Sequence, residues 1–289
     1  MKKETSQTKN YTTAPLPFMG QKRNFLKHFK EVLNSEFKDV IIFVDLFGGS
    51  GLLSHIAKTI KPNSRVIYND YDNYSQRLAN IDRTNIILQK LRVLLHDYTK
   101  DAKLVPEMKS KVLELFKKHE KSGFVDYITL SSSLLFSMNY ATNYDEMSRQ
   151  TLYNKLKKGD YCADGYLAGV EVVSCDYRTL FDKYKHNSDV VFFVDPPYLS
   201  TETDVYKSYW RLKDYLDVLK VLESNSFIYF TSHKSSIIEL CDYIEENLHA
   251  QNPFANAGKR VFTQHLARAG SYQDIMLYKR QVKQFLNVT

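Results

Sequence analysis

Four short apolar segments, each ending at or just before an acidic residue, most constrain how this chain can fold. They cover residues 40–44 (VIIFV), 65–68 (RVIY), 170–173 (VEVV) and 190–194 (VVFFV), and the acids are Asp45, Asp70, Asp176 and Asp195. Short β-branched runs of this kind are typical of strands buried on both faces of a parallel sheet. The carboxyl ends of such strands share one edge, where ligands bind. The sequence therefore predicts an open α/β fold with a ligand site at that edge.

The remaining segments divide the chain further. Residues 227–231 (FIYFT) are predicted as another strand, and residues 260–266 and 274–278 as a terminal antiparallel hairpin connected through residues 269–271. Residues 78–166 contain no convincing buried strand, but their apolar residues recur at helical spacing. We therefore expect a discontinuous catalytic domain of residues 1–77 and 167–289, interrupted by an inserted helical domain of residues 78–166.

Composition narrows the class of protein without deciding it. The net charge of +7 and the pI of about 9.0 favour contact with an acidic polymer such as nucleic acid, although charge alone leaves an ordinary basic protein equally open. No apolar run approaches the ~20 residues needed to span a bilayer, and no apolar signal core follows the polar amino terminus. A soluble, cytoplasmic protein is expected. Three widely spaced cysteines, Cys162, Cys175 and Cys241, lack the spacing of a zinc or redox motif, so no metal is predicted.

Residues 45–51 (DLFGGSG) follow the first predicted strand and open a helix. Such glycines let the backbone turn tightly beside a ligand at a helix amino terminus. The G-x-G-x-x-G dinucleotide spacing and the phosphate loop are both absent, which argues against nicotinamide cofactors and nucleoside triphosphates. Asp70 lies roughly 20 residues further on, where a carboxylate can accept hydrogen bonds from ribose hydroxyls. Taken singly, the loop could be a structural turn and Asp70 a solvated residue.

The Asp195-Pro196-Pro197-Tyr198 tetrapeptide carries the most specific chemical signal. Two prolines fix φ, remove two N–H donors and leave carbonyls that the sheet does not pair. Asp195 and the Pro196 carbonyl can then each accept one N–H from an amino group on a planar ring, while Tyr198 stacks on that ring. The alternative, a proline-rich turn that only stops a strand, leaves the flanking aspartate and tyrosine unexplained.

With these elements in this order, the chain resembles the Dam-type (D12 class, alpha group) DNA adenine-N6 methyltransferases. The resemblance covers most of the chain outside the insertion. It adds residues 18–22 (FMGQK) as an aromatic-x-G-x-K element and Asp176-Tyr177 as the pair beside the cofactor adenine. Together, the glycine loop and the resemblance to this family predict a set of cofactor-binding residues. They are Phe18, Lys22, Asp45, Phe47, Gly49, Ser50, Gly51, Asp70, Asp176, Tyr177 and Asp195.

The resemblance implies a Rossmann-like methyltransferase fold with a terminal antiparallel hairpin and an inserted helical target-recognition domain. It also implies methyl transfer from S-adenosylmethionine to N6 of a flipped adenine in double-stranded DNA, without a metal. The catalytic residues would be Asp195, Pro196, Pro197 and Tyr198. A monomer is expected, and a cognate restriction endonuclease is a candidate partner.

The insertion departs from the family pattern at residues 138–144 (MNYATNY), so no target sequence is carried over. We consider polar and basic side chains of two regions as candidates for contact with DNA bases or phosphates. Loop residues and lysines that are only solvated are the alternative. The candidates are Asn139, Tyr140, Thr142, Asn143, Arg149, Lys155, Lys157, Lys158, Lys259, Arg260 and Arg268.

Other functions stay open at this point. An N4-cytosine or RNA-adenine methyltransferase would present a similar amine to the same loop, although the N4-cytosine enzymes usually carry serine or threonine in place of Asp195. A catalytically inactive DNA-binding relative is a second alternative, and a nicotinamide-dependent oxidoreductase is a third. The segment around Trp210 could be a lid over the site or part of the core.

Overall fold

The structure is a computed structural model that describes residues 10–136, 139–197, 210–266 and 270–281. The chain divides into two compact units, which we call the sheet unit (residues 22–72 and 167–289) and the helical unit (residues 1–21 and 73–166). One boundary coincides with the domain boundary predicted before residue 167. Residues 1–21 and 73–77, which the sequence had placed in the catalytic domain, group with the helical unit.

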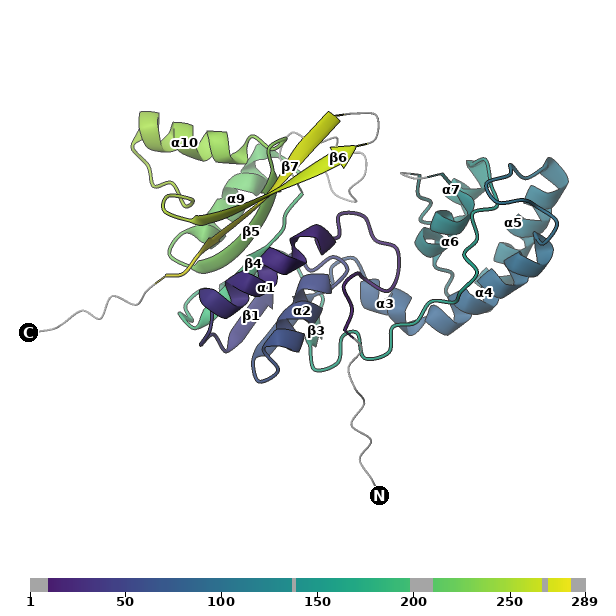
Figure 1. Cartoon of the computed structure of the whole chain (residues 1–289), viewed down its shortest axis with the longest axis horizontal. Coiled ribbons are helices and arrows are strands. Elements are labelled where there is room, and N and C mark those ends of the chain that lie inside the picture. The colour runs from purple at the N-terminus through teal and green to yellow at the C-terminus, as the bar shows by residue number, and fades with distance from the viewer. Residues whose placement is uncertain (1–9, 137–138, 198–209, 267–269, 282–289) are drawn as a thin grey trace, which may run out of the picture. The chain divides into compact units, whose positions relative to one another are not determined.

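The sheet unit contains one seven-stranded sheet in the order β3-β2-β1-β4-β5-β7-β6 (Figure 1). The first five strands are parallel, and β7 pairs antiparallel with both β5 and β6. The strand bounds are β1 Ile42–Asp45, β2 Arg65–Asn69, β3 Glu171–Val173, β4 Val190–Val194, β5 Ser226–Ser232, β6 Gly258–Leu266 and β7 Gly270–Lys279. The order 3-2-1-4-5 is that of a Rossmann sheet, so the predicted α/β fold with a terminal hairpin is confirmed.

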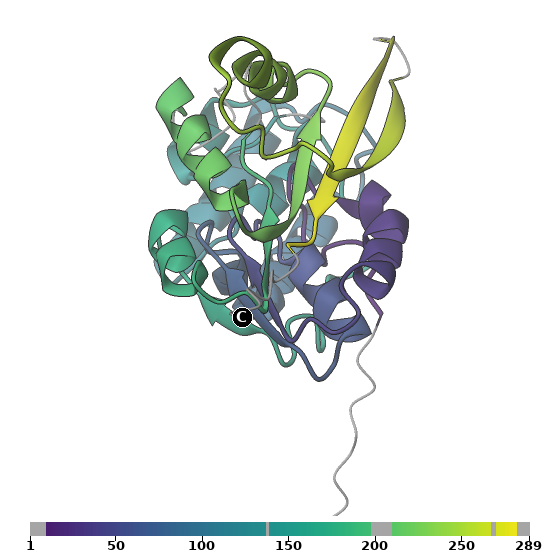
Figure 2. The same ribbon diagram turned by 90° about the vertical axis from the view of Figure 1, so that its left-hand side faces the viewer.

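Helices cover both faces of this sheet (Figure 2). A 3₁₀ helix, η1 (Arg23–Phe25), leads into α1 (Leu26–Ser35), which lies with α2 (Leu52–Ile60) on one face; α8 (Tyr177–Tyr184), α9 (Leu212–Leu222) and α10 (Ile237–Leu248) lie on the other. Alternation along β4 shows why both faces are apolar. Phe193 packs against Phe29 of α1, with ring centroids 5.1 Å apart, whereas Phe192 packs against Phe181 of α8 at 5.3 Å.

The helical unit contains α3 (Tyr74–Ala79), α4 (Ile81–Leu94), α5 (Pro106–Glu120), α6 (Tyr127–Leu134) and α7 (Tyr144–Arg149). Its core includes the apolar residues that the sequence places at helical spacing, among them Ile87, Leu91, Val112 and Phe116. These four side chains are fully buried. Apolar residues at the 3.6-residue spacing therefore form the buried faces of these helices, as the sequence predicts.

An amino-terminal segment is fixed to the helical unit by polar contacts. Arg77 forms a buried ion pair with Asp126 at 3.0 Å and also donates to the Pro17 carbonyl at 2.8 Å. The hydroxyl of Tyr74 pairs with the backbone of Leu16, accepting from its N–H at 2.9 Å and lying 3.1 Å from its carbonyl oxygen. These bonds explain why residues that precede Lys22 group with the helices.

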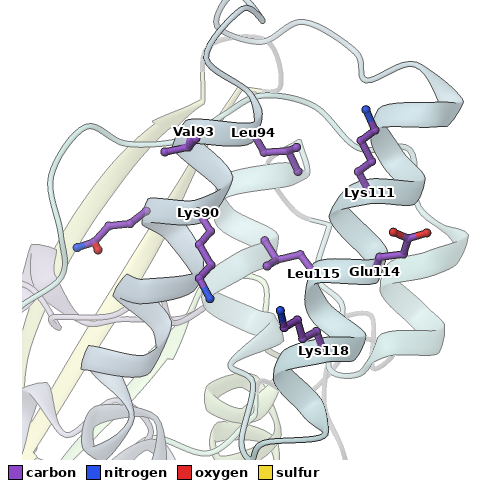
Figure 3. A pocket seen from close by; sticks show the side chains of 8 residues that line it. Lys90, Val93, Leu94, Lys111, Glu114, Leu115 and Lys118 are labelled. Carbon is purple, nitrogen blue, oxygen red and sulfur yellow. The ribbon is translucent and has the colours of Figure 1, made fainter.

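An open groove of about 590 Å³ lies between α4 and α5, and Figure 3 shows side chains that line it. Val93, Leu94 and Leu115 form its apolar part, and Val93 is 75% exposed. The charged side chains around it are Lys90, Lys111, Glu114 and Lys118. In the part of the chain that the structure describes, no helix is long and apolar enough to cross a membrane.

Candidate active site

Four acids lie where parallel strands of the sheet unit end. Asp45 is the last residue of β1, Asp70 follows β2, Asp176 precedes α8 after β3, and Asp195 follows β4. The strands are neighbours in the order β3-β2-β1-β4, so their carboxyl ends share one edge of the sheet. The ladder continues past β1, where the Leu46 N–H donates to the Phe193 carbonyl at 3.0 Å. The sheet thus brings these predicted site segments to the same edge.

Lys22 and Asp195 form the central contact of the site. The Lys22 Nζ lies 2.6 Å from Asp195 Oδ2, and the two side chains are 11% and 16% exposed. The Lys22 carbonyl accepts from the Phe25 N–H at 2.9 Å, so η1 holds the lysine backbone in place. A nearly buried ion pair at this distance gives both groups a fixed orientation.

Opposing effects act on the pKa of Asp195. Burial raises the pKa of this carboxyl, and the Lys22 ammonium opposes the rise. The carboxylate of Asp274, on β7, raises it further. Sequence reasoning had not identified Asp274, because nothing local links a residue of the terminal hairpin to the end of β4. The lysine therefore favours the ionised form of an aspartate that its surroundings would otherwise neutralise.

Asp45 is almost completely buried beside this pair, with 1% of its surface exposed. Its Oδ2 accepts a hydrogen bond from the Ser54 hydroxyl at 2.8 Å, whereas its Oδ1 is buried and has no hydrogen-bond partner among the described residues. Burial raises the pKa of Asp45 to about 7, and the Asp195 carboxylate adds to the rise. The Ser54 hydroxyl, the Phe47 backbone N–H and Lys22 oppose it. Ser54 was not predicted, although its place in the first turn of α2 was a usable signal.

Replacing Asp45 with asparagine should flatten the pH dependence of stability. The pKa of Asp45 rises from 3.8 to about 7 on folding, so the folded state binds more protons than the unfolded state in that interval. Stability is therefore lost as pH rises from about 4 to about 7. A neutral amide at this position keeps a partner for Ser54, and we expect Asp45→Asn to be more stable than the wild type at pH 8 by about 1–3 kcal/mol.

Urea unfolding at pH 4.5, 6 and 8 measures this effect, and Asp39→Asn, a change at an exposed aspartate, is the control. Asp39→Asn should leave the difference between pH 4.5 and pH 8 unchanged. The same pH slope in Asp45→Asn and the wild type would contradict a raised pKa at Asp45.

The glycine turn has a backbone that other residues would not adopt easily. Gly51, the N-cap of α2, has φ of 73°, a left-handed conformation that favours glycine. Its N–H donates to the Gly48 carbonyl at 2.7 Å. A Cβ atom at Gly48 would lie 2.2 Å from the Tyr68 ring, so the turn passes directly against β2. Ser50, inside the turn, is buried, and Gly49 has φ of 50°.

Tyr68 links this turn to Asp70. Its hydroxyl lies 2.7 Å from the Gly49 carbonyl oxygen and 2.9 Å from Asp70 Oδ1. Asp70 is 2% exposed, and its N–H donates to the Val173 carbonyl at 2.7 Å. Sequence reasoning missed Tyr68, although residues two apart on a strand share a face, which places Tyr68 beside Asp70.

An aromatic cluster lies beside the carboxyl end of β3. Tyr177 packs against Phe47 with ring centroids 4.8 Å apart and stacks with Trp210 at 6.0 Å. Burial raises the pKa of Tyr177 to about 12. Asp176 caps α8 by accepting from the Arg178 N–H at 2.7 Å. The cluster joins two predicted cofactor residues, Phe47 and Tyr177, and gives Trp210 a packing role among them.

The remaining predicted catalytic and cofactor residues are placed as follows. Pro196 is buried and Pro197 half-buried directly after β4, and Tyr198 lies outside the described residues. Phe18 belongs to the helical unit, where its ring lies edge-on to Tyr74 at 5.7 Å. No group of three or more His, Cys, Asp or Glu side chains among the described residues could hold a metal ion.

Comparison with known proteins identifies the family. A family model described as D12 class N6 adenine-specific DNA methyltransferase matches residues 18–251, well over half of the chain. The chain belongs to this family. The resemblance stated from the sequence is confirmed, and the protein is a methyltransferase.

A relative from Haemophilus influenzae, provisionally named a methyltransferase, is 37% identical over 285 residues that cover 96% of this chain and 95% of the relative. Among solved structures, a precorrin-6Y C5,15-methyltransferase from Geobacter metallireducens is similar at 10% identity and a TM-score of 0.37, covering 91% of this chain and 95% of that one.

In this D12-class methyltransferase, several candidate DNA residues already have partners. The Thr142 N–H and hydroxyl donate to Glu146 at 2.7 and 2.9 Å, and Asn143 caps α7 by accepting from the Glu146 N–H at 2.9 Å. Lys155 pairs with Asp101 at 2.8 Å. Thr142 and Asn143 are nevertheless exposed, as are Asn139, Arg149, Lys157, Lys158, Lys259 and Arg260. Tyr140 and Lys155 are half-buried, and Arg268 lies outside the described residues.

Proposed function

We propose that this D12-class methyltransferase transfers a methyl group from S-adenosylmethionine to N6 of adenine in double-stranded DNA. The observation that carries the proposal is the Lys22–Asp195 ion pair at 2.6 Å, set at the start of Asp195-Pro196-Pro197 beside the glycine turn. The family's own description, N6 adenine-specific DNA methyltransferase, supports the target atom and the DNA substrate.

The residues of the site fit S-adenosylmethionine. Asp70, at the end of β2, can accept from ribose hydroxyls. The unpaired, buried Oδ1 of Asp45 offers an acceptor to a cationic or N–H-bearing ligand, because a buried acceptor without a partner costs free energy until one arrives. The turn at Gly48 lets the backbone approach the ligand closely. When bound, this cofactor supplies an electrophilic methyl group on a sulfonium.

Asp195 and the Pro196 carbonyl would act on the nucleophile. Adenine N6 has its lone pair delocalised into the ring, and acceptors that favour a more tetrahedral nitrogen make it more nucleophilic in the transition state. Asp195 accepts an N–H more strongly when it is ionised, and the Lys22 ammonium favours that form. Fixed placement of the amine reduces the entropic part of the barrier.

A duplex substrate requires the target base to leave the helix. An adenine stacked inside DNA cannot reach the end of β4, and extrusion costs a few kcal/mol in lost stacking. The net charge of +7 supports attraction to DNA, because contact with phosphates releases condensed counterions.

The decisive experiment incubates the protein with tritiated S-adenosylmethionine and unmethylated bacterial DNA, then digests the DNA and identifies the labelled nucleoside. The proposal predicts label in N6-methyldeoxyadenosine. Label in cytosine, or label only when RNA replaces DNA, would overturn it.

The exposed lysines of the helical unit provide a test of the DNA partner. We expect the double variant Lys157→Gln/Lys158→Gln to bind a DNA duplex more weakly and to reduce the salt slope of log K by about 1–2, since each phosphate contact contributes about 0.9. Fluorescence anisotropy at several salt concentrations measures both quantities.

The matched control removes the same charge from the sheet unit, at the amino-terminal edge of the sheet, where Lys38 precedes β1 and Lys61 follows α2. Lys38→Gln/Lys61→Gln should leave the salt slope close to that of the wild type. Equal slopes in both double variants would contradict a DNA contact at Lys157 and Lys158.

A further inference from the structure

Asn69 lies at the carboxyl end of β2, between the ends of β3 and β1, although no motif singles it out. It is the last residue of β2 and is 1% exposed. Because β2 lies between β3 and β1, the segments that follow both neighbours pass on either side of it. Asp70, the predicted ribose acceptor, is the next residue in the chain.

The side-chain amide of Asn69 is bonded to both of these segments. Its Nδ2 donates to the Leu46 carbonyl at 3.0 Å and to the Cys175 carbonyl at 3.0 Å. Its Oδ1 accepts from the Cys175 N–H at 3.1 Å. Both donor hydrogens and one acceptor site are therefore used in a buried position, which requires a short primary amide.

The two bonded segments are those that carry the other cofactor residues. Leu46 leads into the glycine turn of residues 47–51, and Cys175 immediately precedes Asp176 and Tyr177. Asn69 is thus a common polar partner of the two segments, with its side chain between their backbones. A ligand that contacts both loops and Asp70 needs them held at a fixed spacing.

We propose that Asn69 is a positioning residue for the cofactor, tying the loops after β1 and β3 together so that both contact S-adenosylmethionine at once. The inference rests on the proposed function for the identity of the cofactor. Asn69 acts through the backbone of its neighbours and makes the site pre-organised, which strengthens binding by reducing the ordering that the ligand must impose.

Asn69→Ala tests this role. We expect the dissociation constant for S-adenosylmethionine, measured by calorimetry, to rise about tenfold or more, because small displacements of several groups weaken a site strongly. The KM for the cofactor should rise with it, and kcat should change less. Without any ligand, amide hydrogen exchange should speed up at Cys175 and in the glycine turn together.

Asn252→Ala is the matched control. Asn252 is also buried in the sheet unit and also bonds a nearby backbone, accepting from the Phe254 N–H at 2.9 Å. It lies just before β6, which begins opposite the end of β7 at the amino-terminal edge of the sheet. This variant should lower thermal stability without changing cofactor affinity or exchange at the two loops. If Asn69→Ala does not fold, Asn69→Ser serves in its place.

The outcomes separate this inference from the proposed function. A wild type that binds no S-adenosylmethionine would reject the function, and ligand-free exchange would still decide whether Asn69 ties the loops. A wild type that binds the cofactor, beside an Asn69 variant with the same affinity and the same exchange at both loops, would overturn the inference alone.

Discussion

Asp195→Asn is expected to reduce kcat for methyl transfer by about 10²–10³-fold. Asparagine has nearly the same shape, but one carboxylate oxygen becomes an NH₂ group, which donates where the target amine needs an acceptor. The variant also loses the charge that pairs with Lys22 at 2.6 Å. Single-turnover assays with tritiated S-adenosylmethionine measure the loss directly.

The affinity of this variant for its substrates should change far less than kcat, because the proposed interaction between Asp195 and the amine is made mainly in the transition state. Asp182→Asn is the control, since Asp182, on α8, is exposed and pairs with Lys185 just after that helix. It should retain wild-type activity. Wild-type turnover by Asp195→Asn would remove Asp195 from the reaction.

Gly48→Ala is expected to destabilise the fold by about 2–3 kcal/mol and to abolish measurable cofactor binding. The new Cβ would lie 2.2 Å from the Tyr68 ring and 2.9 Å from the Asn69 carbonyl oxygen. Either the turn or β2 must move, and the neighbouring bonds from Tyr68 to Gly49 and Asp70 would break with it. Urea unfolding and calorimetry measure the two effects.

The same substitution has a control elsewhere in the chain. A Cβ at Gly159, in a loop of the helical unit, would meet no atom within 4 Å. Gly159→Ala should therefore change stability by no more than about 0.5 kcal/mol in either direction. Comparable losses in the two variants would show that the close approach at Gly48 does not explain its effect.

The charge distribution of the site illustrates how function and stability compete. Asp45 is 1% exposed and has an unpaired oxygen, and the carboxylates of Asp195 and Asp274 lie in the same neighbourhood. Lys22 is the cation that pairs with Asp195 there. Bringing carboxylates close together in a buried position is unfavourable for folding, and the raised pKa values of Asp45 and Asp195 are consequences of it.

Local sequence patterns were sufficient for the strands and the turn. The runs at residues 190–194 and 227–231 became β4 and β5 within one or two residues, because an apolar β-branched run has few alternatives in a parallel sheet. The helical spacing of Ile87 and Leu91 predicted the helix α4 equally well. The order of the glycine turn, Asp70 and Asp195-Pro196-Pro197 also sufficed to indicate the family.

Two residues of the site had no local signal. Asn69 ties two loops, and Asp274 approaches Asp195 from β7. Each depends on which strands become neighbours, and that choice is made by long-range pairing. For the same reason the sequence could not show that residues before Lys22 group with the helices through Arg77 and Tyr74.

By itself, then, the sequence determined which segments form strands, where the chain must turn and which acid precedes the two prolines. These local features depend on side-chain shape and backbone freedom within a few residues. Only the tertiary structure decided that Lys22 meets Asp195, that Asp45 is buried with an unpaired oxygen and that Asn69 joins the loops. Those contacts connect residues far apart in the chain, and their geometry follows from the order of the strands in the sheet.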